Sequence, residues 1–299
     1  MKTSHLVLLL AMNFCWAAVY SAYKVIGPEL PYGGIVTLRF GLGGLCLLAV
    51  WPWVRGPAPR GRDLVVTCLL GVIVYVVGQR MQVGGNQLGT AGNSSVLMAV
   101  EPLVASVAAA LFLREGIGPR RLAGFGLGLL GVGLLNGVWR ADFQWTGLMA
   151  SLLFLASFVC EAANSVLGKP ISGRASVVKM LAISLLVGTA VNLVIDGRST
   201  VRLAATLSAG AWVLLIAMGV ICTAVGYSLW FIVIRECPVN VAALTLFAQS
   251  VFGVILAALW VGEKLHWSQL LGSLTIVAGL VLGLSRQIKR STSPEWSIS

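Results

Sequence analysis

The chain has 299 residues, of which 58% are hydrophobic and 10% are charged, and its formal net charge is +11. Soluble proteins have about 25% charged residues, so this composition excludes an ordinary soluble domain. The basic excess raises the possibility of a nucleic-acid binder, but the positions of the charges along the chain argue against that class.

Apolar runs long enough to cross a membrane recur from one end of the chain to the other. A bilayer core about 30 Å thick requires about 20 apolar residues of helix. We expect helices because each spanning segment must satisfy its own backbone polar groups. The runs predict an all-α membrane protein with ten transmembrane helices, at residues 5–26, 34–54, 64–83, 90–113, 119–138, 145–168, 176–195, 209–234, 240–261 and 266–285.

The lysines and arginines are divided unevenly between the two ends of these spans. Most of them, such as Arg60, Arg120 and Arg174, flank the span ends that lie on the same side as the N-terminus. Because cytoplasmic loops carry an excess of Lys and Arg, both termini are predicted to be cytoplasmic. The basic excess then reflects membrane topology, and no nucleic-acid partner is expected.

The second half of the chain repeats the first. Residues 70–78 (LGVIVYVVG) resemble residues 218–226 (MGVICTAVG), an offset of 148 residues. The same offset pairs further positions of the two halves: Glu115 with Glu263, Gly124 with Gly272, and Gly131 with Gly279. The predicted units are a first five-helix repeat at 1–143, a second at 144–286 and a polar cytoplasmic tail at 287–299. Because five is odd, the second repeat is inverted relative to the first, which is typical of transporters. A duplicated structural or pore-forming bundle is the alternative.

Several segments resemble a known family. Residues 16–24 (WAAVYSAYK), followed by Pro31 and Arg39, are similar to the opening of the drug/metabolite transporter (DMT) superfamily, EamA-type branch. Residues 111–133 and 259–281 resemble the helix–Glu–turn–helix unit that closes each EamA repeat. The resemblance implies ten helices, alternating access and export of small metabolites, and it is nearest to the amino-acid exporters, including the aromatic amino-acid group. Two positions of the first span depart from the family pattern, Ala17 and Val19.

Polar and aromatic side chains form stripes along six of the predicted spans. Polar groups are costly in lipid and face the bundle interior, and residues three, four or seven apart share one face of a helix. We therefore expect spans one, three, four, six, eight and nine to line a substrate cavity, and the Gly-rich spans five and ten to pack at the periphery. The candidate cavity residues are Asn13, Trp16, Tyr20, Tyr75, Gln79, Ser94, Glu101, Ser157, Glu161, Asn164, Tyr227, Trp230 and Gln249.

The charged residues within the spans have two interpretations each. Glu101, directly before Pro102, is either a proton or substrate-amine site or a protonated carboxyl bonded to a neighbouring helix. Lys24, Arg39 and Arg80 fall in the outer half of their spans, where snorkelling to the surface competes with a carboxylate-binding or gating role. Two further glutamates are expected to act in capping and turn geometry, Glu115 and Glu263.

Residues that enzymes and metal sites require are scarce. The two histidines, His5 and His266, lie at span ends, the aspartates Asp63, Asp142 and Asp196 are expected in loops, and there is no phosphate-binding P-loop. The chain is therefore predicted to be no enzyme, with no catalytic residue, no metal and no cofactor, and coupling to a proton stays open. The cysteines lack CxxC spacing and are expected to be buried as small apolar side chains: Cys15, Cys46, Cys68, Cys160, Cys222 and Cys237.

Together, these features predict an exporter of amino acids or similar small metabolites in the bacterial cytoplasmic (inner) membrane. The expected partners are a small-molecule substrate and membrane lipid, with no ATPase subunit. A multidrug exporter of lipophilic cations and a passive metabolite channel are the alternatives. The sequence leaves the oligomeric state open.

Overall fold

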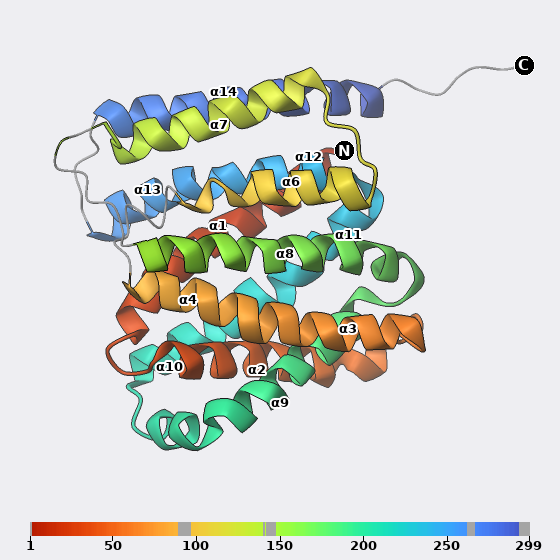
Figure 1. Cartoon of the computed structure of the whole chain (residues 1–299), viewed down its shortest axis with the longest axis vertical. Helices are drawn as coiled ribbons and strands as arrows, with labels where there is room; N and C mark the ends of the chain where they lie inside the picture. The colour runs from red at the N-terminus through yellow and green to blue at the C-terminus, as the bar shows by residue number, and fades with distance from the viewer. Residues whose placement is uncertain (1, 89–96, 140, 142–147, 262–266, 293–299) are drawn as a thin grey trace, which may run out of the picture.

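Helices account for all regular secondary structure in the part of the chain described by the computed structural model, residues 2–88, 97–139, 141, 148–261 and 267–292 (Figure 1). The first half contains α1 (Thr3–Ile26), α2 (Tyr32–Val50), the 3₁₀ turn η1 (Trp51–Trp53), α3 (Arg62–Val72), η2 (Ile73–Gly78), α4 (Gln79–Leu88), α6 (Glu101–Phe112) and α7 (Pro119–Asn136). The second half contains α8 (Leu148–Arg174), α9 (Val177–Ala204), α10 (Ala209–Ala217), η3 (Met218–Val225), α11 (Gly226–Glu236), α12 (Val239–Leu244), the 3₁₀ turn η4 (Thr245–Phe247), α13 (Ala248–Val261) and α14 (Trp267–Thr292).

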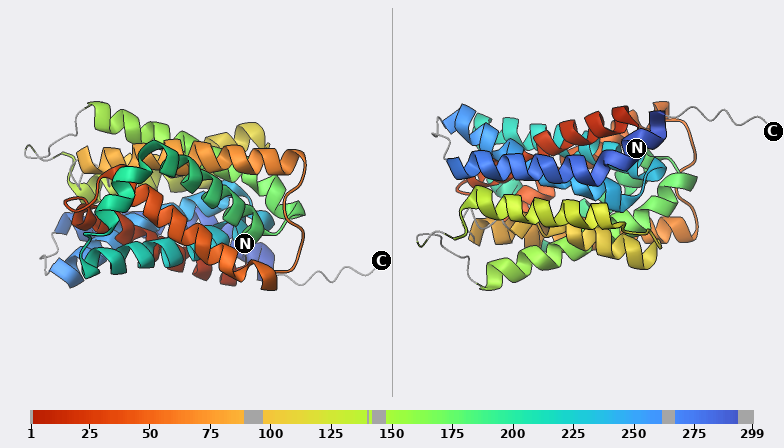
Figure 2. Two further views of the ribbon diagram at one scale, coloured as in Figure 1. Left: turned by 90° about the horizontal axis from the view of Figure 1, so that it is seen from below. Right: turned by 90° about the horizontal axis from the view of Figure 1, so that it is seen from above.

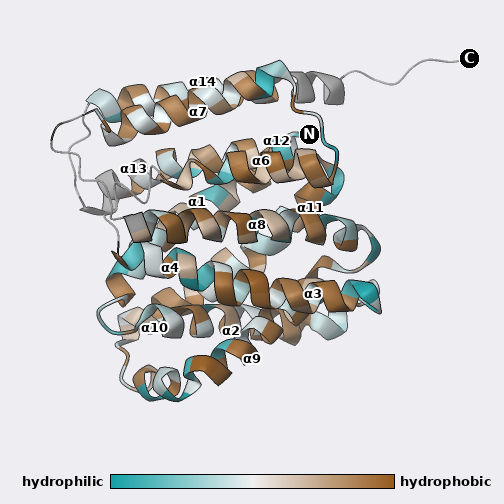
Figure 3. Ribbon diagram, viewed as in Figure 1, coloured by the Kyte–Doolittle hydropathy of each residue, from teal (hydrophilic) through white to brown (hydrophobic). Residues whose placement is uncertain are grey.

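The helices have the length and composition of membrane spans. Within the described residues, seven helical segments are long and apolar enough to cross a bilayer, and two shorter apolar helices cover Glu101–Phe112 and Val239–Gly253. Each of the ten predicted spans contains helix, so the prediction of an all-α membrane protein is confirmed. Figure 3 shows hydrophobic residues along most helix surfaces, as expected for a bundle that faces lipid.

Some helices differ from the predicted spans at their ends. α9 continues to Ala204, so Asp196, expected in a loop, lies within this helix at a kink with φ −142° and ψ 20°. α14 continues to Thr292, beyond residue 286, where the second repeat was expected to end. The expected boundary between the repeats, at residue 143, lies outside the described residues.

The repeated sequence segments adopt the same irregular conformation. Both η2 and η3 are π-helical, with one wider turn inserted between two α-helices. These segments overlap the stretches 70–78 and 218–226 that match at the offset of 148. Single π-turns within α-helices occur frequently at functional sites, and the residues that follow η2 and η3 include Gln79 and Tyr227, which occupy equivalent positions of the two halves.

α7 and α14 pack side by side at one edge of the bundle (Figures 1 and 2), in agreement with the peripheral position expected for these two Gly-rich spans. A Cβ atom built on Gly124 would lie 2.8 Å from the carbonyl oxygen of Gly279, and one built on Gly272 would lie 2.6 Å from that of Gly131. Under the offset of 148, Gly124 corresponds to Gly272 and Gly131 to Gly279, so the two contacts are equivalent in the two repeats. Glycine is therefore needed for the two backbones to approach this closely.

Within the described ranges, the buried apolar residues form two clusters. The larger one joins α1, α2, α9 and α11, and the smaller one lies beneath α7 and α14 and includes Phe125, Phe247 and Ile276. All six cysteines are free thiols; Cys222 and Cys237 are buried and the other four are partly exposed. The expectation that every cysteine is buried is therefore wrong for those four.

Candidate functional site

A small cavity lies inside the bundle and is lined by residues from both halves of the chain. It offers about 40 Å³ to the centres of water molecules, which is room for a few waters and too little for an amino acid. Its walls are mostly polar or aromatic, in contrast to the apolar bundle around it. The lining residues are Trp16, Val19, Tyr20, Arg39, Gln79, Gln82, Glu101, Glu161, Tyr227 and Gln249.

A second, smaller cavity of about 20 Å³ has four lining residues in common with the first: Trp16, Glu101, Glu161 and Tyr227. The rest of its wall is mainly apolar or aromatic. Trp230 lies in this wall and donates a hydrogen bond from Nε1 to Ser165 Oγ over 3.1 Å. The two cavities together place a polar compartment next to an apolar one.

Glu161, on α8, receives hydrogen bonds from both halves of the chain. Gln79 Nε2 donates to Glu161 Oε1 over 2.5 Å, and the Tyr227 hydroxyl donates to the same oxygen over 3.0 Å. Gln79 directly follows η2, and Tyr227 follows η3 after one residue, Gly226. The repeated π-turns therefore place equivalent residues of the two halves on one carboxylate.

Trp16 connects α1 to the second half of the chain. Its Nε1 donates to the carbonyl oxygen of Cys222 over 2.7 Å, within η3. Its ring lies 5.4 Å from that of Tyr227 and 6.3 Å from that of Trp230, centroid to centroid. These three aromatic side chains form a continuous wall beside Glu161.

Arg39, on α2, lies in the cavity wall, so the snorkelling interpretation is wrong for this residue. Only 4% of it is exposed. Its Nε donates to Thr223 Oγ1 over 2.9 Å, its Nη1 donates to the hydroxyl of Tyr23, and its guanidinium lies 4.8 Å from the ring centroid of Phe40. The sequence places Arg39 in the outer half of its span, but it does not show where the side chain points. That direction depends on the contact with Thr223, which belongs to η3.

Asn13 and Gln249 join α1 to α13. Asn13 Nδ2 donates to both the carbonyl oxygen and Oγ1 of Thr245, over 3.0 and 3.1 Å, and Asn13 Oδ1 accepts from Gln249 Nε2 over 3.1 Å. Asn13 is fully buried and is not among the residues that line either cavity. It connects the two helices, whereas Gln249 also reaches the larger cavity.

Three further candidates are buried but are not among the lining residues of either cavity. Ser157 Oγ donates to the carbonyl oxygen of Phe154 in its own helix. Tyr75 packs edge-on against Tyr227, with ring centroids 5.5 Å apart, and Asn164 is 3% exposed. The remaining candidate, Ser94, lies outside the described residues.

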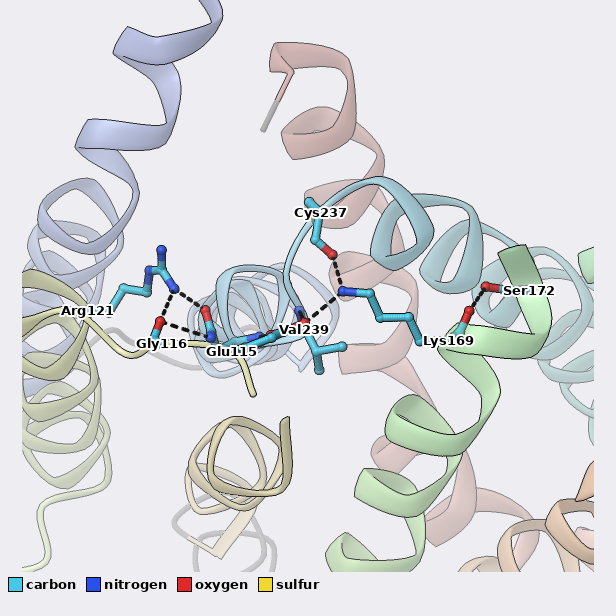
Figure 4. A network of polar contacts seen from close by, with 8 residues as sticks. Glu115, Gly116, Arg121, Lys169, Ser172, Cys237 and Val239 are labelled. Atoms are coloured by element: carbon cyan, nitrogen blue, oxygen red, sulfur yellow. Dashed lines mark hydrogen bonds and ion pairs between the residues drawn. The ribbon is translucent and has the colours of Figure 1, made fainter. Parts of the chain in front are cut away.

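Glu115 holds the two halves together away from the cavity (Figure 4). It accepts from Lys169 Nζ over 2.7 Å and from the backbone N–H groups of Val239 and Asn240 over 3.0 and 3.1 Å. Arg121 donates to the side chain of Asn240. The capping role predicted for Glu115 is confirmed, and the helix that it caps is α12 of the other half. Its repeat partner, Glu263, lies outside the described residues.

Arg80 is held by α9. Its Nη2 lies 2.6 Å from Asp196 Oδ2, and its Nη1 donates to Asn192 Oδ1 over 2.9 Å. The snorkelling interpretation of Arg80 is therefore wrong, because this guanidinium is ion-paired within the protein. Lys24, by contrast, is an exposed residue of α1.

Comparison with known proteins assigns the family. The model of the EamA-like transporter family matches residues 3–137 and 148–285. The chain belongs to the EamA-like transporter family. This EamA-like protein is therefore a membrane-embedded transporter and not an enzyme, as predicted.

Its relatives are also named as transporters. The "Probable terminal-alkyne amino-acid exporter" of Streptantibioticus cattleyicolor is 23% identical, over 97% of each chain. "Uncharacterized transporter YvbV" of Bacillus subtilis is 26% identical, over 94% of this chain and 92% of the relative. "Uncharacterized inner membrane transporter YedA" of Escherichia coli is 28% identical over 58% of this chain and 57% of its own. A solved crystal structure with 17% identity matches 98% of this EamA-like chain and 100% of its own, with a TM-score of 0.76, and so has the same fold.

Proposed function

We propose that this EamA-like transporter exports amino acids or similar small metabolites across the cytoplasmic (inner) membrane by alternating access, with both termini in the cytoplasm. The observation that carries the proposal is the cavity between the two halves, where polar and charged side chains converge inside an apolar bundle. Intramembrane polar residues mark substrate pathways because burial in lipid otherwise disfavours them.

The size of the cavity supports a mechanism with more than one conformation. Space for a few waters does not hold an amino acid, so a substrate enters only after the surrounding helices separate. We take the halves at 1–143 and 144–286 as the two bodies that move. Inverted repeats supply two conformations of similar energy, open to opposite sides.

The choice of amino acids rests on the chemistry of the wall and on a relative. The cavity contains both a guanidinium, Arg39, and two carboxylates, Glu101 and Glu161. The relative from Streptantibioticus cattleyicolor is named as an amino-acid exporter. The second candidate is export of lipophilic cations, favoured by the excess of carboxylates and by the ring of Trp16 beside Glu161.

The test is uptake of a panel of radiolabelled amino acids into proteoliposomes, with and without a pH gradient. We expect saturable uptake of several amino acids, and we expect Gln79→Ala to reduce it because Gln79 contacts Glu161. Thr275→Val is the control, since Thr275 is half-buried on α14, is not a lining residue of either cavity, and donates its hydroxyl to Leu271 within its own helix.

Each alternative gives a different result. Uptake of an organic cation but of no amino acid would show that lipophilic cations, and not amino acids, are the substrates. Uptake that does not saturate would favour a passive channel. Equal transport by Gln79→Ala and Thr275→Val would remove the cavity from the substrate pathway.

A further inference from the structure

The guanidinium of Arg39 is buried, and its hydrogen-bond partners among the described residues are neutral. Its two hydrogen bonds, to Thr223 and Tyr23, use two of its five N–H groups. None of the ion pairs found among the described residues includes Arg39. A buried charge is stable only when it is paired and hydrogen-bonded, so this site favours an anion that enters the cavity. The remaining N–H groups form the planar fork that binds a carboxylate through two parallel bonds.

Glu161 and Gln79, in contrast, present acceptor atoms that need a hydrogen-bond donor. Both hydrogen bonds to Glu161 reach Oε1, which leaves Oε2 without a donor among the described residues. Gln79 is 2% exposed, and its buried Oε1 has no hydrogen-bond partner in the part of the chain that the structure describes. Glu101 lines the same cavity. These three groups are acceptors, and an ammonium group carries three N–H donors.

The second cavity gives a place for the rest of the ligand. It borders the acceptor group at Glu161 and Glu101, and its wall includes Trp230, Ala105 and Leu246. Apolar and aromatic surfaces of this kind bind an apolar or aromatic group. The cavity pair therefore has one site for a carboxylate, one for an ammonium and one for an apolar side chain.

We infer that the substrate is a zwitterionic amino acid with an apolar or aromatic side chain, whose carboxylate binds Arg39 and whose ammonium binds Glu161, Gln79 Oε1 and Glu101. This inference rests on the proposed transport function and adds the orientation of the substrate. A ligand with only one of the two charges leaves Arg39 or Glu161 buried and unpaired, and this penalty excludes it.

The experiment compares three ligands that share one side chain. Phenylalanine has both charges, phenethylamine lacks the carboxylate, and 3-phenylpropionate lacks the ammonium. Inhibition of phenylalanine counterflow is measured in proteoliposomes of the wild-type chain. We expect each analogue to inhibit at least about tenfold more weakly than phenylalanine, the factor that corresponds to one lost charge pair of about 1.4 kcal/mol.

Two variants then test which residue binds the carboxylate and which binds the ammonium of the ligand. Arg39→Gln should lose the preference for phenylalanine over phenethylamine while it still rejects 3-phenylpropionate. Glu161→Gln should show the reverse pattern. A purely structural role would weaken all three ligands together, so the crossed pattern distinguishes ligand contact from support of the fold. Arg39→Lys, which keeps the charge but loses the fork, should be intermediate.

The outcomes separate this inference from the proposed function. If the wild-type protein transports phenylalanine but binds both analogues equally well, the zwitterion site is refuted and amino-acid export stands. The same conclusion follows if Arg39→Gln and Glu161→Gln change all three ligands by the same factor. If the wild-type protein transports no amino acid, the proposed function itself fails. The comparison of wild-type ligands needs no variant, so it decides the question even if Arg39→Gln does not fold.

Discussion

The contact between α7 and α14 allows a stability test in which the same substitution is made at two positions of one helix. Gly131 faces α14, where an added Cβ would lie 2.8 Å from the carbonyl oxygen of Gly272 and 2.9 Å from the backbone nitrogen of Ile276. Gly126, in the same helix, is exposed, and an added Cβ would meet no atom of the described residues within 4 Å. Gly131→Ala and Gly126→Ala therefore differ in packing and share the change in helix preference.

The magnitude follows from these distances. Alanine is favoured over glycine within a helix by about 1 kcal/mol, and both variants gain this term. Gly131→Ala additionally forces two backbones apart, since real Cβ atoms do not approach backbone atoms closer than 3.0 Å. Overpacking of this kind costs about 1–3 kcal/mol. We expect Gly131→Ala to be less stable than Gly126→Ala by this amount.

The assay is reversible unfolding in mixed micelles, followed by the loss of tertiary structure, with the free energy of unfolding compared between the two variants. Gly279→Ala checks the repeat, because a Cβ there would lie 2.9 Å from the carbonyl oxygen of Gly124; it should be destabilised in the same way as Gly131→Ala. Equal stability of Gly131→Ala and Gly126→Ala would refute the close approach of the two helices.

Two further predictions concern polar contacts outside the cavities. Glu115→Gln should destabilise the protein by about 1.5–3 kcal/mol, the range for hydrogen bonds to charged groups, because Glu115 caps α12 and pairs with Lys169 at side-chain exposures of 10% and 22%. Glu236→Gln, which removes a more exposed pair with Lys2, should cost clearly less because exposed ion pairs contribute little to stability, so equal losses of unfolding free energy in micelles would contradict the capping role. Hydrogen bonds from the backbone N–H and the hydroxyl of Ser208 lower the pKa of Glu29 below its ordinary value of 4.5. Its contribution to stability is then present above pH 4.5 and lost as the pH falls through the lowered pKa. The difference in thermal unfolding midpoint between wild type and Glu29→Gln should shrink below pH 4.5, and a difference that does not change with pH would show that Glu29 is not held by Ser208.

The polar and aromatic stripes along single helices were predictable from the sequence, because the face that a residue occupies depends only on the periodicity of its own helix. Trp16 and Tyr20 share a face at helical spacing, and both line the larger cavity. Tyr75 and Gln79 are four residues apart, but Tyr75 lies within the π-helical η2 and Gln79 directly follows it. Such a turn rotates the following residues relative to an ideal α-helix, so Gln79 reaches Glu161 while Tyr75 packs against Phe40 and Tyr227.

The sequence by itself determined the helices, the internal repeat and the family. Long apolar runs leave no stable alternative to helix in lipid, and a repeat is visible wherever matched residues recur at one offset. Only the tertiary structure decided which polar groups meet. Arg39 reaches Thr223, and Gln79 and Tyr227 converge on Glu161, across separations of 184, 82 and 66 residues. The periodicity of a single helix carries no information about contacts of that range, because they depend on how different helices cross.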